Sequence, residues 1–229
     1  MATPIQNFTS AETWFGGYYE IEFELGVPSD GRLALALQTV WSHPSLEGCY
    51  LSRDLEPHTQ VRVSPRDRAT EGHLYGLANL PNGAKAACGT YVCRLQGEGQ
   101  TPSRDLLTFY VPLGALALSY RIGGYPFSEA DQVAGWRVPL DEWLVKMGRF
   151  VYKQVPFALA LIGFEVDFPE VDAKSVQQNG VPAERYDGYL LEVGGRLEWY
   201  PPTNWDLACF PNSDAANGRG STPSSEPRT

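Results

Sequence analysis

Histidine and cysteine are the side chains through which this chain could perform nucleophilic chemistry. The three histidines, His43, His58 and His73, are evenly spaced along the sequence, and this spacing brings no two of them onto one helix or strand. It therefore predicts no metal site and no cofactor. Sequence reasoning offers one catalytic pairing, Cys49 with His73, because an imidazole beside a thiol produces a reactive thiolate. The alternative is that Cys49 is a buried and inert thiol.

The cysteines indicate reduced thiols rather than disulfides. Cys88 and Cys93 stand an odd number of positions apart on one predicted strand, so they face opposite sides and can neither bridge each other nor share a metal. Residues 1–10 have no basic start and no apolar stretch, which argues against a secretion signal. We therefore expect a cytoplasmic protein with reduced thiols.

Three glutamates share one side of a predicted strand. Residues 18–25 alternate between large apolar and polar side chains, which predicts one buried and one solvated face. Glu20, Glu22 and Glu24 then lie on the solvated face, about 7 Å apart. They could simply keep that face wet and deter edge pairing, or they could form an acidic platform for Lys and Arg of a partner. A cation site is the weaker functional reading, because calcium loops place their acids on tight turns.

An acidic pair follows the most apolar stretch of the chain. Residues 157–166 are apolar on both faces, which is typical of a central strand that is covered on both sides. Glu165 and Asp167 stand at its end, where a carboxyl group can acquire a raised pKa and act as an acid or base. The alternative is that they mark the point where the strand meets water. Glu165 thus joins Cys49 and His73 as a catalytic candidate.

Two aromatic segments are candidates for binding. Tyr125 and Phe127 flank a proline inside the glycine-rich stretch 123–135, and Trp199 and Tyr200 precede two prolines. Flat aromatic and proline surfaces suit the docking of a peptide or ligand. They equally suit a loop that is pinned onto the core.

Local signals predict the elements that position these residues. Period-two patterns and turn residues indicate strands at 18–25, 46–52, 73–80, 86–95, 106–113, 157–166, 186–193 and 196–200. Asn82-Gly83 and Gly194-Gly195 are the turns of two hairpins. Helical spacing indicates a helix over 30–42, a second helix that Pro139 opens and Pro156 ends, and a short helix over 172–178.

These elements predict an α+β protein. We expect one domain over residues 1–210, with a mixed or antiparallel sheet and two main helices packed on it, as in ferredoxin-like folds or a related two-layer sandwich. Residues 53–72 are predicted to form a long surface loop. Residues 211–229 contain almost no large apolar side chain and are expected to be disordered.

The charge, the apolar runs and the motifs of the chain argue against several classes of function. The formal net charge is −9, so the chain repels phosphate backbones and a nucleic-acid ligand is not expected, whereas a basic protein partner is. No apolar run is long enough to span a membrane. The sequence has no nucleophile elbow, Walker loop or dinucleotide fingerprint, and its motifs resemble no known family.

The leading hypothesis is a non-catalytic protein-binding module, such as a modulator, an adaptor or a toxin-neutralising partner of the immunity type. Its binding residues would be Glu20, Glu22, Glu24, Tyr125, Phe127, Trp199 and Tyr200. The alternative is an enzyme of unrecognised class that uses Cys49, His73 and Glu165, and a purely structural subunit is a third reading. Sequence patterns do not decide between catalysis and binding, and they predict no oligomeric state.

Overall fold

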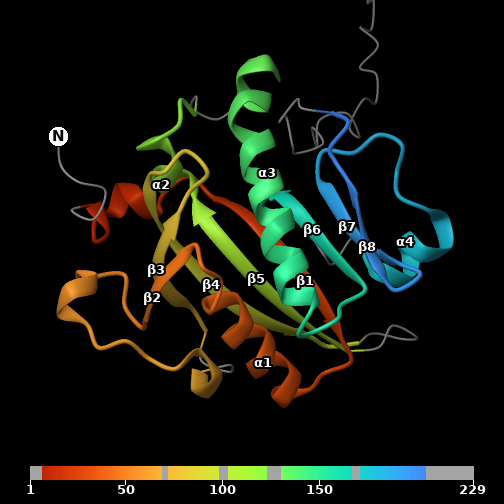
Figure 1. Ribbon diagram of the computed structural model, residues 1–229, viewed down its shortest axis with the longest axis horizontal. Helices are drawn as coiled ribbons and strands as arrows, with labels where there is room; N and C mark the ends of the chain where they lie inside the picture. Colours follow the sequence, from red (N-terminus) through yellow and green to blue (C-terminus); the bar gives the residue numbers. More distant parts are fainter. Residues whose placement is uncertain (1–6, 69–71, 98–102, 123–129, 167–170, 205–229) are drawn as a thin grey trace, which may run out of the picture.

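The fold is built around one eight-stranded sheet (Figure 1). The computed structural model describes residues 7–68, 72–97, 103–122, 130–166 and 171–204. The strands are β1 (Tyr18–Gly26), β2 (Leu46–Tyr50), β3 (Leu74–Asn79), β4 (Lys85–Leu95), β5 (Arg104–Pro112), β6 (Leu159–Phe164), β7 (Gly188–Val193) and β8 (Arg196–Tyr200). The helices are α1 (Asp30–Trp41), α2 (Leu113–Ala117), α3 (Ala130–Tyr152) and α4 (Ala173–Asn179).

The sheet has the strand order β2-β3-β4-β5-β1-β6-β7-β8, and every neighbouring pair is antiparallel. Strand β1 lies between the meander β2–β5 and the meander β6–β8. The connection through α1 carries the chain from β1 to the sheet edge at β2, and α3 links β5 to β6 across β1. An α+β fold with an antiparallel sheet is therefore confirmed. The ferredoxin-like arrangement is not confirmed, because this sheet has eight strands.

Helix α1 follows its sequence signals closely. The Ser29 side chain accepts a hydrogen bond from the backbone N–H of Arg32, as an N-cap residue does. The helix buries an apolar stripe of Leu33, Ala36, Leu37 and Val40. These positions recur at the three- and four-residue spacing that places side chains on one helix face, so the sequence pattern was sufficient to predict the buried side.

Helix α3 corrects the prediction that Pro139 opens the second helix. The helix begins at Ala130, and Pro139 lies inside it. Residues 130–135, which were predicted to be irregular, are therefore helical. A proline inside a helix removes one backbone hydrogen bond, and tertiary contacts offset this cost here: Trp136 and Arg137 are both buried one turn before the proline. The stretch 123–129 lies outside the described residues.

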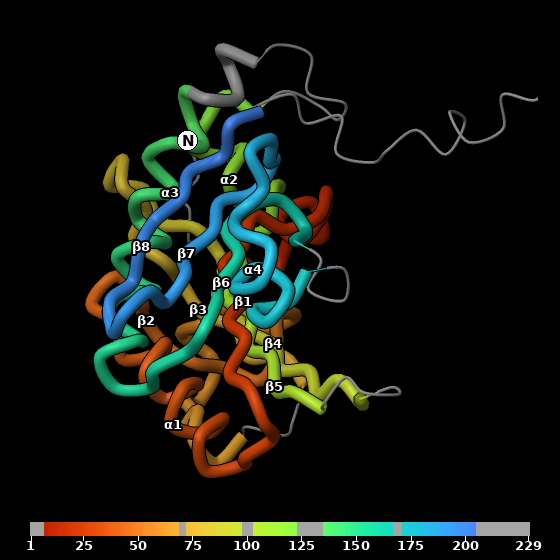
Figure 2. Tube along the Cα trace, turned by 90° about the vertical axis from the view of Figure 1, so that its right-hand side faces the viewer, coloured from red at the N-terminus to blue at the C-terminus, as the bar shows by residue number. Residues whose placement is uncertain are grey.

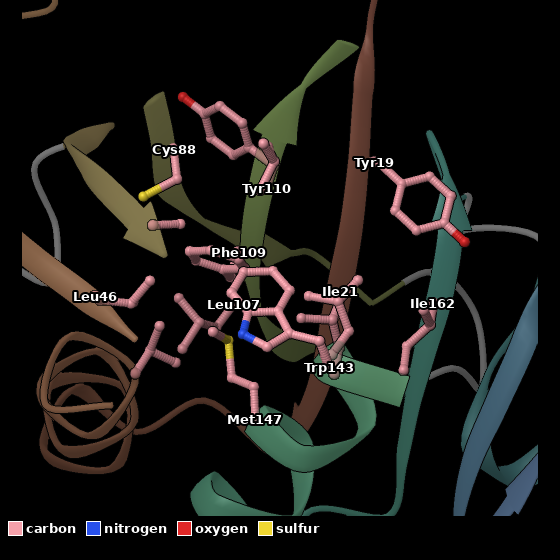
Figure 3. Close-up of a cluster of buried hydrophobic side chains, with 14 of the residues drawn as sticks. Tyr19, Ile21, Leu46, Cys88, Leu107, Phe109, Tyr110, Trp143, Met147 and Ile162 are labelled. Carbon is pink, nitrogen blue, oxygen red and sulfur yellow. The ribbon is translucent and has the colours of Figure 1, made fainter. Parts of the chain in front are cut away.

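The main core lies between the sheet and helices α1 and α3, on the side that we call the helix face. Figure 3 shows Trp143 and Met147 of α3 against Ile21, Leu107 and Phe109 of the sheet. The rings of Phe109 and Trp143 meet edge-on, with centroids 5.7 Å apart. Since these side chains are all buried, the apolar positions of β1 and β5 fix the position of α3 on the sheet.

The opposite side, which we call the second face, carries a smaller apolar cluster. Ala173 and Val176 of α4 pack with Leu159, Leu161 and other residues of β6 and β7, and Figures 1 and 2 show α4 beside these strands. Strand β6 is buried at every position. This confirms the prediction of a strand covered on both faces, although the strand spans Leu159–Phe164 rather than the predicted 157–166.

The remaining predicted elements are mostly found. Both hairpins form, and their turns contain Gly83, Gly194 and Gly195 with positive φ angles. The short helix α4 ends before Gly180, which also has a positive φ. Strand β5 begins at Arg104, earlier than predicted, and α2 follows it without having been predicted.

The segment after β2 is more ordered than a simple surface loop. It contains two short 3-10 turns, Pro57–Thr59 and Pro65–Arg68, and the first proline of each turn is buried. No helix in the described ranges is both long and apolar enough to cross a membrane. The proposed extent of the domain, residues 1–210, and the cytoplasmic location stay predictions. The tail 211–229 lies outside the described residues.

Candidate functional site

A buried polar network lies on the helix face, where α3 crosses β1. The hydroxyl of Tyr19 in β1 donates a hydrogen bond to Oδ1 of Asp141 in α3. The same hydroxyl accepts a bond of 3.0 Å from Nε of Arg137, one helical turn before Asp141. Arg137 is fully buried and also donates through Nη2 to the carbonyl oxygen of Tyr186, at 2.7 Å. The network therefore ties α3 to β1 and to the segment before β7.

Burial raises the pKa values of the carboxyl groups around this network. Burial raises the pKa of Asp141 to about 7, although Arg137 and the Tyr19 hydroxyl act in the opposite direction. Burial likewise raises the pKa of Asp187, beside β7, to about 6, against the attraction of Arg137. Oδ2 of Asp141 is buried and has no hydrogen-bond partner among the residues that the structure describes. Perturbed carboxyl groups of this kind occur at catalytic sites and also in structural ion clusters.

Sequence reasoning missed this network. With Pro139 as the predicted start of the second helix, Arg137 falls outside the predicted helix and Asp141 falls inside it. A signal was present, because Arg137 and Asp141 are four positions apart and face the same side of a continuous helix. Because Pro139 was predicted to open the helix, this four-residue spacing was not recognised as a shared helix face.

The second face carries a different set of side chains over β3, β4, β5 and β1. Opposite positions in the sheet place Tyr91 beside Thr108 and Thr108 beside Glu22. Two positions further along β5, Tyr110 lies beside Glu20. The Thr108 hydroxyl donates a bond of 3.0 Å to Oε1 of Glu22, so this glutamate points toward β5.

Five aromatic side chains form a continuous layer on this part of the second face. We call it the aromatic layer; its members are Tyr18, His73, Tyr75, Tyr91 and Tyr110. The ring centroids of Tyr18 and Tyr110 are 4.4 Å apart, those of Tyr91 and Tyr110 are 5.9 Å apart, and His73 stacks on Tyr75. The Tyr110 hydroxyl is also 3.0 Å from Nδ1 of His73.

The aromatic layer has an exposed and a buried part. Tyr110 is almost fully buried beneath its neighbours, and Gly89 leaves room for it because a Cβ at Gly89 would come within 2.5 Å of the Tyr110 ring. Tyr18, Tyr75 and Tyr91 are half-buried, and His73 is exposed. The layer therefore presents aromatic surface to the outside while it covers the sheet.

The structure corrects the prediction of a solvated glutamate face. Glu20 is 2% exposed and Glu22 is 5% exposed, whereas Glu24 is half-buried. The reason is that β1 lies in the interior of a wide sheet, where the aromatic layer lies on one side of the glutamates and the α4 cluster on the other. That these glutamates bind a partner stays a prediction.

Burial and like charge raise the pKa of Glu20 well above its usual value. Burial is the largest cause, and the nearby carboxylates of Glu22, Glu165 and Asp187 add to it, while the backbone N–H of Val166 opposes it. The pKa of Tyr91 is also raised, by burial first and then by Glu20. The carboxyl groups of β1 therefore lie close enough to the aromatic layer to act on the pKa of Tyr91.

The opposite margin of the aromatic layer carries a positive charge. Burial lowers the pKa of His73, and Arg53 lowers it further. Arg53 itself is exposed. The layer therefore lies between carboxylates at β1 and a guanidinium group near β3.

The catalytic candidates do not form one site. Cys49 is buried on the helix face near Trp41, and burial raises the pKa of its thiol to about 12. His73 bonds to Tyr110 on the second face, so the sheet separates the two proposed members of the dyad. Glu165 is exposed at the end of β6, where its backbone N–H donates to the Tyr18 carbonyl oxygen.

Only two of the four predicted aromatic binding residues lie within the described part of the chain. Tyr125 and Phe127 lie outside the described residues. Trp199 packs over Gly188 on the helix face, and the Tyr200 hydroxyl donates to Glu198 at 2.7 Å. Both side chains are half-buried, and their role in binding stays a prediction.

The cysteines and possible metal ligands add no reactive centre within the described ranges. Cys49, Cys88 and Cys93 are free thiols. Cys88 lies in the main core and Cys93 packs against the α4 cluster, which confirms that they face opposite sides of the sheet. No group of three or more histidine, cysteine or acidic side chains in these ranges could hold a metal ion.

Comparison with known proteins identifies no relative. The chain matches no family model, no curated protein and no solved structure.

Proposed function

We propose that this protein is a non-catalytic binding module that docks a basic segment of a protein partner on the aromatic layer of the second face. One observation carries the proposal. Three half-buried tyrosines and an exposed histidine lie together over the sheet, next to buried glutamates. Modulator, adaptor and toxin-neutralising roles all require a surface of this kind.

The residue types support docking. Tyrosine is enriched at protein interfaces because it buries a large area and keeps a polar hydroxyl group. Tyr18 and Tyr91 are also held by ring contacts with Tyr110, at 4.4 and 5.9 Å, so a partner would lose little side-chain entropy in ordering them. Preorganised aromatic side chains are the usual source of binding energy at interface hot spots.

The charges support a basic partner. A Lys or Arg side chain is attracted to the face of an aromatic ring, and Tyr18, Tyr75 and Tyr91 are each half-buried, with part of the side chain open to such a partner. The net charge of −9 on the whole chain attracts such a partner from a distance. This attraction weakens as salt increases.

The alternative of an enzyme would have to use different groups from those predicted. Cys49 and His73 lie on opposite faces of the sheet, so the observation that favours catalysis is the network of Tyr19, Arg137 and Asp141. Its carboxyl group with a pKa of about 7 could exchange a proton near neutrality. A ligand that contacted Asp141 would favour this alternative over the docking function.

The docking proposal is tested with peptides selected for binding. A random peptide library is selected on the full-length protein, and the enriched peptides are synthesised and titrated against wild-type protein and Tyr91→Ala. We expect Lys and Arg in the enriched peptides and a loss of affinity of about 30-fold in Tyr91→Ala, the size of an interface hot spot. Tyr91→Phe should retain most of the affinity because it keeps the ring.

Tyr186→Ala is the matched control, because Tyr186 is an exposed tyrosine outside the aromatic layer. It should bind the peptides as the wild type does. Enrichment of acidic or uncharged peptides would contradict the proposal, and so would equal affinities of Tyr91→Ala and Tyr186→Ala.

A further inference from the structure

A pocket with apolar walls lies on the second face, where α4 and the segment after it meet β7 and β8 (Figure 1). Its volume is about 450 Å³, within the range of small-molecule sites. Its walls include Val176, Val181, Leu191 and Tyr200, which belong to the α4 cluster or pack against it. Val193, at the end of β7, is 41% exposed and extends this wall toward solvent. The pocket therefore suits a ligand with an apolar body.

The described lining of this pocket contains two charged residues, Arg185 and Glu192. Successive side chains of β7 lie on opposite faces of the sheet, since Leu190 packs in the main core and Leu191 in the α4 cluster. Glu192 therefore belongs to the helix face, and its Oε1 accepts a bond of 2.6 Å from the backbone N–H of Gly195. Arg185 is the charge that this pocket presents on the second face.

The fold holds Arg185 in place. Its Nη1 donates to the carbonyl oxygens of Pro182, at 2.8 Å, and Ala183, at 3.4 Å. Its own carbonyl oxygen accepts hydrogen bonds from the backbone N–H groups of Thr203 and Asn204, at 2.9 and 3.0 Å. A ligand would therefore lose little entropy in ordering this side chain.

The other edge of the Arg185 guanidinium group, formed by Nε and Nη2, is open to a ligand. Nε has no hydrogen-bond partner among the described residues, and no acidic side chain within these ranges forms an ion pair with Arg185. The neighbouring Glu184 instead accepts a bond of 3.1 Å from the side chain of Asn204. Two parallel N–H groups on one edge of a guanidinium group match the two oxygens of a carboxylate.

We propose that this pocket binds a small monocarboxylate with an apolar body, of the size of an arylalkanoate or a branched-chain acid. The carboxylate forms two hydrogen bonds with Arg185, and the apolar body packs against Val176, Val181 and Leu191. A monoanion balances the single guanidinium group, whereas a phosphate dianion would add an unpaired negative charge to an acidic protein. This site is separate from the aromatic layer and does not depend on the docking function.

Calorimetric titration of the full-length protein tests this site. The probes are 3-phenylpropionate, 4-methylpentanoate and hexanoate. The controls are 3-phenylpropionamide, which has no charge, 3-phenylpropylamine, which has a positive charge, phenylphosphonate, and acetate, which has no apolar body. We expect at least one probe to bind saturably with a Kd below about 1 mM, and each control to bind at least tenfold more weakly. In the ¹H–¹⁵N spectrum, the amide signals of Val181, Leu191 and Val193 should shift with the bound probe.

Two variants locate the binding. Arg185→Gln should weaken it at least tenfold, whereas Arg149→Gln, at an exposed arginine of α3, should not. Val193→Asp places a carboxylate at the wall without removing the bonds of Arg185 to its own segment, and it should also weaken binding at least tenfold. Tyr91→Ala should leave it unchanged. The proposal is overturned if no probe binds, if 3-phenylpropionamide binds as well as 3-phenylpropionate, or if Val193→Asp or Arg185→Gln binds like Arg149→Gln.

Discussion

Arg137 shows what the burial of a charged residue requires. Its guanidinium group is fully buried, and it lies among Tyr19, Asp141 and the Tyr186 carbonyl oxygen. Removing an ion from water costs several kcal/mol, and partners with good geometry offset that cost. Truncation of any one partner would remove part of this compensation while the other groups stay buried, so this network is a sensitive point of the fold.

Asp141 makes the stability of the protein depend on pH. Its pKa is about 7 in the folded protein, above the ordinary value of 3.8. Between these two values the folded state holds a proton that the unfolded state releases, so this group lowers the free energy of unfolding as pH rises toward 7. We expect Asp141→Asn to lose less Tm than the wild type between pH 5 and pH 8, as measured by thermal unfolding.

The neighbouring groups shape this prediction. Asp187 and Glu142 raise the pKa of Asp141, and Arg137 and Tyr19 lower it. Glu12→Gln serves as the control because Glu12 is exposed in the segment that precedes β1, and its pH profile should follow the wild type. If Asp141→Asn lost Tm as steeply as the wild type, Asp141 would not be the group that titrates.

Helix α3 shows at the scale of an element how packing overrides a local signal. A proline at position 139 predicts a helix start, yet the helix extends nine residues before it. The buried side chains of Trp136 and Arg137 stabilise the additional turns. Helix boundaries next to proline therefore depend on what the preceding residues contact.

Replacing two glycines of α3 by alanine distinguishes the effect of core packing on stability from the effect of helix propensity. A Cβ at Gly148 would lie 2.5 Å from Cδ2 of Leu190 and 3.2 Å from Cδ1 of Ile21, and both of these side chains are fully buried. Overpacking of a core costs about 1–3 kcal/mol. We therefore expect Gly148→Ala to lower the free energy of unfolding in a denaturant titration, although alanine favours helix.

Gly135→Ala is the matched change in the same helix. Within the described part of the chain, no atom lies within 4 Å of a Cβ at Gly135, so this variant should be more stable by about 1 kcal/mol from helix propensity alone. Equal shifts in the two variants would show that Gly148 is not closely packed against the sheet.

At the scale of the whole molecule, the width of the sheet determines which strands resist local unfolding. Strand β1 has a neighbour on each side, β5 and β6, and both of its faces are covered. Strands β2 and β8 stand at the two edges. Backbone amides of central strands open only when a large part of the structure unfolds, whereas edges open locally.

Hydrogen–deuterium exchange followed by mass spectrometry tests this order. We expect peptides from β1, β5 and β6 to exchange most slowly and peptides from β8 to exchange early. The half-exposed residues of β8 support this expectation. Protection of β8 equal to that of β1 would indicate that another segment or a partner covers this edge.

Local patterns determined much of the secondary structure. The alternation in residues 18–25 predicted β1, the helical spacing in residues 30–42 predicted α1, and Asn82-Gly83 and Gly194-Gly195 predicted two hairpins. Each of these signals acts through backbone angles or through side chains a few positions apart. These elements therefore depend less on the rest of the fold than the start of α3 does.

The tertiary structure alone decided which polar side chains are buried and which come together. Period two shows that Glu20 and Glu22 share a face, but whether that face is wet depends on the place of β1 in the sheet and on the aromatic layer beside it. Likewise, Cys49 and His73 lie on opposite faces, and Tyr19 meets Arg137 and Asp141. These outcomes depend on contacts between residues far apart in the chain, which no local spacing encodes.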